Sequence, residues 1–188
     1  MLDFTAVRNK QITWMEFAND LTKADLIIFT HEMADRLLEL LADCQDADVI
    51  FEPDDPVAKD TYAENPEEID LAWNLGHVIV HVIASSEESA FLAAEMARGV
   101  EPHGRSRYEV PWQEVVTIEQ CRHSIKQNRR MILATLDVWP DEPHLDITYE
   151  AREGLVVNPI VRFLLGLSHA ESHIEQIKAI IRQAKAAR

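Results

Sequence analysis

The sequence predicts an all-α protein, a four-helix bundle with long loops between its helices. Its 188 residues include only 5 glycines against 8 prolines, which disfavours a turn-rich β sandwich and is typical of long helices joined by proline-containing loops. Apolar residues recur at helical spacing over four long segments. Helices of about 40–50 Å can bury such apolar stripes only against one another. A chain of this size can also form one core without disulfides, so we expect a single domain over residues 1–188.

Capping residues and helix-ending residues give the expected bounds. Thr13 and Glu16 form a capping box before the first apolar series. Asn65 and Pro66 suit the start of the second helix, and Gly99 suits its end. Pro111 suits the start of the third helix, and the pair Asn158-Pro159 suits the start of the fourth. The four helices are therefore predicted over approximately residues 14–43, 66–98, 111–138 and 159–187.

Two long loops separate these helices. The first runs from Gln45 to Asn65 and the second from Asp141 to Val157. Within the second loop, only Leu145 to Tyr149 alternates as a strand does. Loops of this length in a compact domain are often functional, so we expect them to form the walls of a site.

The charge balance excludes several partners. The formal net charge is -15, whereas binding to nucleic acid requires clustered cations, so no nucleic-acid partner is expected. No segment approaches the about 18 apolar residues of a membrane span, so no membrane partner is expected. The N-terminus has no signal-peptide pattern, and Cys44 and Cys121 lie far apart in the sequence. These features favour a reduced, cytoplasmic protein.

The second helix contains an unusual polar stripe. Between Leu71 and Ala84, the only side chains that are not apolar are those of Asn74, His77 and His81. At 100° per residue they share a face that continues through Ser85 and Glu88. This stripe is either the solvent face of the helix or part of a functional site, and the helix alone does not decide between them.

The fourth helix contains a second histidine pair. His169 and His173 are four residues apart, so their rings stack on one face of the helix at a spacing that suits a shared metal ion. Neutral imidazole is a common ligand of zinc, nickel, copper and iron. Together with His77 and His81, the pair predicts a joint metal site that leaves coordination positions for water or substrate.

Two segments of the chain resemble the DinB-like (DinB/YfiT) superfamily of four-helix-bundle metalloenzymes. They are Trp73 followed eight positions later by His81, and His169-x-x-x-His173-x-x-Gln176 in the last helix. The resemblance implies a metal triad of His81, His169 and His173. It also implies a divalent metal. Three imidazoles accept zinc, nickel or iron, and of these we expect zinc or nickel before iron.

The same resemblance suggests an activity. Relatives include S-transferases that use low-molecular-weight thiols, so we expect a small-molecule substrate, a metal that activates a bound thiol or water, and a homodimer. His77 would lie outside the triad, as an outer contact, a proton shuttle or an exposed side chain. Gln176 would hydrogen-bond a ligand imidazole or a metal-bound water.

Two alternatives lie outside catalysis. The first is a hemerythrin-like carrier or metal sensor, for which His31 and His123 would join the other helical histidines. The second is a metal-free interaction protein. His31 is expected to be a core or boundary residue, while His103 and His144 lie beside prolines in loops. Neither cysteine has a motif for nucleophilic catalysis.

Overall fold

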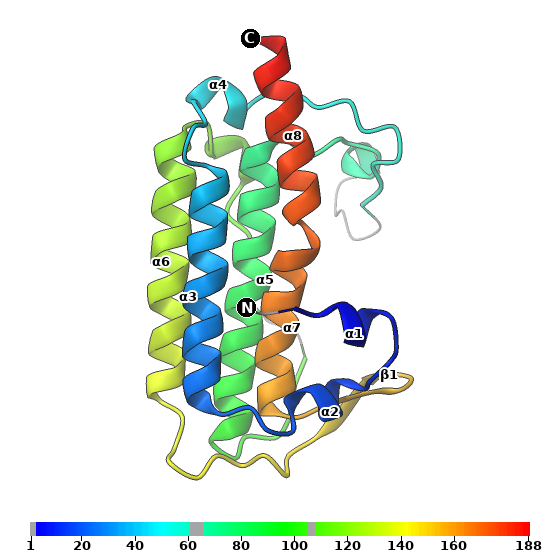
Figure 1. Ribbon diagram of the computed structural model, residues 1–188, viewed down its shortest axis with the longest axis vertical. Helices are drawn as coiled ribbons and strands as arrows, with labels where there is room; N and C mark the ends of the chain where they lie inside the picture. Colours follow the sequence, from blue (N-terminus) through cyan, green and yellow to red (C-terminus); the bar gives the residue numbers. More distant parts are fainter. Residues whose placement is uncertain (1–2, 61–65, 105–107) are drawn as a thin grey trace.

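The computed structural model describes residues 3–60, 66–104 and 108–188 and confirms the all-α class. The long helices are α3 (Lys23–Leu40), α5 (Leu75–Ala97), α6 (Ile118–Asp137) and the pair α7 (Pro159–Ser172) and α8 (Ile174–Ala187). They lie side by side as in a helix bundle (Figure 1). Helix α5 packs against α6 and α7, and α3 packs against the same two helices.

Shorter elements surround these helices. They are α1 (Thr5–Arg8), α2 (Trp14–Ala18), α4 (Asp46–Val49) and the 3-10 turns η1 (Pro66–Glu68) and η2 (Trp112–Glu114). Strands β1 (Tyr149–Arg152) and β2 (Leu155–Val157) form an antiparallel hairpin in which Tyr149 pairs with Val157. In Figure 1 this hairpin and α2 lie near the lower end of α7.

The core lies between the long helices. Its fully buried side chains come from all of them and include Leu26, Ile79, Ile125, Leu136, Phe163, Leu164, Ile174 and Ile177. No helix in the described part of the chain is long and apolar enough to cross a membrane.

The first predicted helix, 14–43, is divided in the structure. The Thr13–Glu16 capping box is present at the start of α2. A second capping box joins Thr22 and Asp25, and it starts α3 after a break. Polar side chains that bond to nearby backbone groups compete with helix continuation, which explains the break between the two helices.

The second and third helices begin later than predicted. Helix α5 starts at Leu75, where the Asn74 side chain accepts a hydrogen bond of 2.9 Å from the His77 backbone N–H. Pro66 starts only a 3-10 turn, and Asn65 lies outside the described residues. Pro111 likewise precedes a 3-10 turn. Helix α6 is capped instead by Thr117.

Gly99 ends α5 as predicted. Its φ of 92° lies in the left-handed region that favours glycine. The Gly99 N–H bonds to the Met96 carbonyl at 3.0 Å, and the Val100 N–H bonds to the Glu95 carbonyl at 3.0 Å. These two bonds form a Schellman motif, which satisfies carbonyls at the helix end.

The predicted helix 159–187 changes at His173. Asn158 caps α7 by accepting a 2.8 Å bond from the Val161 N–H, but the His173 N–H bonds to the carbonyl of Ala170 at 3.2 Å. This bond spans three residues instead of four, so α7 ends at Ser172 and α8 begins at Ile174. A histidine of the predicted metal triad therefore lies at the junction.

Helices α5 and α7 approach closely at Gly166. A Cβ at this position would lie 2.7 Å from the Ser89 Cβ and 3.1 Å from the Ser86 Cα. Gly166→Ala is therefore expected to lower the free energy of unfolding by about 1–3 kcal/mol, because the two helices must separate. Denaturant unfolding measures the change. Gly104→Ala is the control, since a Cβ there meets nothing within 4 Å; equal stability of the two variants would contradict the close approach.

Candidate metal centre

Three imidazoles from two distant segments of the chain converge. His81 comes from α5, His169 from α7 and His173 from the junction with α8. Each offers one ligand atom, and these atoms lie within 4.8 Å of one another. The Nε2 atoms of His81 and His169 are 2.9 Å apart. All three side chains are partly buried, so the group has both a protein side and a solvent side.

The donor set fits a divalent transition-metal ion. Two nitrogens bound to one zinc ion at the tetrahedral angle lie about 3.4 Å apart, so small ring movements would fit the three imidazoles around an ion. Neutral imidazoles suit zinc, nickel and iron. Within the described residues this is the only group of potential metal ligands, and it has three members. Three ligands leave coordination positions on the ion for water or substrate.

Side-chain contacts orient two of the rings. The Nδ1 of His173 lies 2.7 Å from the Oε1 of Gln176. An amide oxygen only accepts, so Nδ1 carries the proton and the lone pair is on Nε2. The Nδ1 of His81 lies 3.3 Å from a carboxylate oxygen of Glu109. Sequence reasoning missed Glu109, because it lies between η2 and the end of α5 in a loop without periodicity or motif.

His77 is buried and does not join the triad. Its ring lies between two indoles, stacked on Trp73 with centroids 4.4 Å apart and on Trp112 with centroids 4.9 Å apart. The suggestion that it is an exposed side chain is therefore wrong. Trp73 also contacts His81, with centroids 4.5 Å apart, so this aromatic stack forms one wall of the histidine group.

Burial lowers the pKa of His77 from 6.5 to about 4, and the Glu109 carboxylate opposes this effect only in part. The unfolded chain therefore binds a proton more readily than the folded chain between these pH values. We expect the stability that depends on neutral His77 to be complete above pH 6.5 and to be lost as the pH falls toward 4, by roughly 2–4 kcal/mol.

Urea unfolding of the metal-free protein across this pH range checks the expectation. His77→Phe keeps an aromatic ring between the indoles but cannot be protonated. Its stability should fall less steeply with acid than that of the unmodified protein. If the free energy of unfolding fell equally with acid in both proteins, His77 would not be the cause of the loss.

The rest of the polar stripe on α5 is not a solvent face. Glu88 is buried and lies 4.0 Å from the Arg162 guanidinium of α7. Arg162 also donates a 3.0 Å hydrogen bond to the Ser89 hydroxyl. The stripe therefore faces α7, because polar groups buried between helices need partners.

The remaining histidines lie apart from the group. His31, expected at a core or boundary position, is exposed, and so is His123. His103 pairs with Glu95 at 2.7 Å, and a Cβ on Gly99 would lie 3.3 Å from the His144 ring. The described residues thus do not assemble the larger histidine set of a hemerythrin-like centre.

The cysteines are poor nucleophiles. Both are buried and unpaired. Burial raises the pKa of Cys121 to about 12 and also raises the pKa of Cys44. Since the thiolate is the reactive form, neither side chain is suited to attack a substrate at neutral pH.

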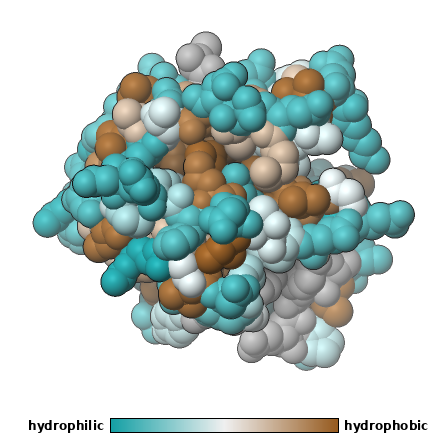
Figure 2. Space-filling model, turned by 90° about the horizontal axis from the view of Figure 1, so that it is seen from below, coloured by the Kyte–Doolittle hydropathy of each residue, from teal (hydrophilic) through white to brown (hydrophobic). Residues whose placement is uncertain are grey.

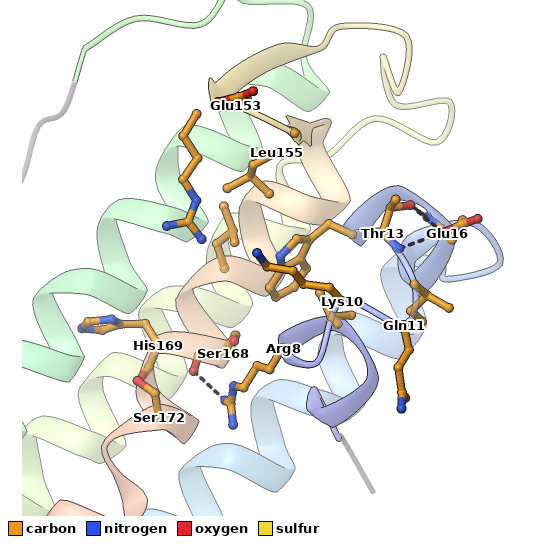
Figure 3. Close-up of a pocket in the computed structure, with 16 residues that line it drawn as sticks. Arg8, Lys10, Gln11, Thr13, Glu16, Glu153, Leu155, Ser168, His169 and Ser172 are labelled. Carbon is orange, nitrogen blue, oxygen red and sulfur yellow. Dashed lines mark hydrogen bonds between the residues drawn. The ribbon is translucent and has the colours of Figure 1, made fainter.

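A cavity of about 890 Å³ lies beside the histidine group and includes His169 and Ser172 in its wall (Figure 3). The other walls come from the N-terminal segment, residues 7–16, and from the hairpin turn, residues 152–155. The long loop before α7 therefore contributes a wall, as the sequence predicts. The loop before α5 contributes none among its described residues.

The packed helices and the three-histidine group define an all-α protein with a candidate metal centre. The family model described as the DinB superfamily matches residues 30–177. The chain therefore belongs to the DinB superfamily, and the matched range includes all three histidines. No curated protein and no solved structure matches the chain significantly.

Proposed function

We propose that the protein is a metal-dependent enzyme whose divalent ion, zinc or nickel before iron, is bound by His81, His169 and His173. One observation carries the proposal: three imidazoles converge within 4.8 Å, and one of them, His169, lines a cavity large enough for a small molecule. A purely structural site usually has four protein ligands. The described residues provide three.

The ion would supply a Lewis acid that lowers the pKa of a water or thiol binding beside it. The protein itself supplies orientation. Gln176 fixes the tautomer of His173, and Glu109 lies against the outer nitrogen of His81. The indoles of Trp73 and Trp112 enclose His77 and exclude water from one side of the group.

Thiol-dependent S-transfer is the activity that we propose first. The resemblance to thiol-dependent S-transferases of the DinB-like group supports it, as does a cavity that could hold a thiol and its acceptor together. We also propose that the protein is a cytoplasmic homodimer and that its substrate is a small molecule.

Cobalt substitution tests this proposal. We expect the protein to bind about one cobalt ion per chain, and 2-mercaptoethanol to produce a thiolate-to-cobalt charge-transfer band that ethylene glycol does not produce. Cobalt binding without such a band would favour a non-catalytic metal carrier or sensor. Failure to bind cobalt, zinc, nickel or ferrous iron would leave a metal-free interaction protein.

A further inference from the structure

The cavity beside His169 has cationic side chains in its wall although the chain is strongly acidic. Arg8 and Lys10 approach from the N-terminal segment, and Arg152 from the hairpin. Figure 3 shows Arg8 and Lys10 reaching toward α7, the helix that carries His169. The chain has a formal net charge of -15, whereas this wall has three cationic side chains and only two carboxylates, Glu16 and Glu153.

Two of these cations are available to a ligand. Arg8 forms an ion pair with Glu171 and donates a 3.2 Å hydrogen bond to the Ser168 carbonyl, so its charge is already balanced. The side chains of Lys10 and Arg152 have no hydrogen bond or ion pair with any residue that the structure describes. Lys10 is held in the left-handed region, with a φ of 56°, in the turn after α1.

The acidic residues of the wall do not pair with Lys10 or Arg152. The Glu16 carboxylate accepts bonds from the backbone N–H and the hydroxyl of Thr13, at 2.7 and 2.9 Å, as part of the α2 capping box. Figure 3 shows Glu153 at the outer edge of the hairpin turn. The cavity therefore offers an anion two cations that other residues have not engaged.

Apolar side chains complete the wall. They are Val7, Ile12, Trp14, Leu155 and Leu165. A ligand with an apolar body and an anionic head would satisfy both kinds of surface, because apolar contact contributes affinity and a charged group sets orientation. His169 and Ser172 lie in the same wall, so such a ligand would lie beside the one histidine of the group that lines the cavity.

We propose that this cavity binds small organic anions with an apolar body, held at the anionic group by Lys10 and Arg152. The binding stands on the cavity alone; only the ligand's role as a substrate rests on the proposed function.

Binding of two fluorescent probes to the metal-free protein tests the proposal. Anilinonaphthalene sulfonate has an anionic head, whereas phenylnaphthylamine has the same aromatic body without charge. Lys10→Gln and Arg152→Gln should each raise the Kd of the sulfonate by about 3- to 10-fold and leave the Kd of the neutral probe unchanged. Both positions are exposed, so the variants should fold. Arg98→Gln, an exposed cation outside the cavity, is the matched control.

An unchanged Kd for the sulfonate in both cavity variants would overturn the proposal. Equal weakening of both probes would also overturn it, because the cations would then shape the wall without recognising charge. Since no metal takes part, this result is independent of the cobalt experiment.

Discussion

His169→Ala is expected to remove tight metal binding. Apparent binding free energies of about 10–16 kcal/mol for zinc in four-ligand sites correspond to about 2.5–4 kcal/mol per ligand, so the Kd should rise about 10²- to 10³-fold. Competition with a chelator of known affinity measures the change. His81→Ala and His173→Ala should behave alike, because all three rings belong to one group.

Two further variants make this expectation specific. His123→Ala removes an exposed histidine outside the group, and His77→Phe replaces the buried imidazole beside the group with a ring that cannot bind metal. Both should keep the metal affinity within about threefold. If His77→Phe lost metal binding and His81→Ala kept it, His77 would be the metal ligand on α5, and the proposed triad would be wrong. Circular dichroism confirms that each variant is folded.

The histidine pair of the last helix could be predicted because its chemistry is local. His169 and His173 are one turn apart in sequence, and their rings have centroids 4.7 Å apart in the structure. The choice between His77 and His81 needed tertiary structure. Both lie on the same face of α5, but His77 is covered by Trp112, a residue that follows α5 and returns over it.

The helix starts were harder to predict because the sequence offers several competing caps. Asn65-Pro66 and Asn74 both suit a helix start, but Glu67, Glu68 and Asp70 follow the first, whereas a mainly apolar segment interrupted only by His77 and His81 follows Asn74. The break at His173 has no local signal of glycine or proline. Both α7 and α8 contact α3 and α5, but α7 also contacts α2 and β2, whereas α8 contacts α4. A single periodic pattern does not reveal this difference in surroundings.

The cavity was beyond sequence reasoning for a related reason. Residues 7–16 and the hairpin turn at 152–155 line it together, although about 140 positions separate them. Neither segment carries a recognisable ligand-binding motif. Glu109 likewise reaches His81 from an aperiodic loop. Contacts of this kind depend on how loops return to the helices, whereas spacing rules describe only the helices themselves.

The contact between Gln176 and His173 leads to a second large effect. The 2.7 Å bond from the ring Nδ1–H to the amide oxygen holds the lone pair on Nε2, which leaves that nitrogen free to bind a metal ion. Gln176→Leu removes the acceptor, so the ring can rotate and change tautomer. The metal Kd is then expected to rise about 10- to 100-fold.

Gln176→Glu is the matched variant, because a carboxylate at this position still accepts the hydrogen bond and adds negative charge near the ion. Its metal affinity should equal or exceed that of the unmodified protein. A side chain that mattered only for packing would give the opposite order, since leucine suits a helix margin better than a second carboxylate beside Glu175. If Gln176→Leu bound metal as tightly as the unmodified protein, the orientation of the His173 ring would not depend on its hydrogen bond to Gln176.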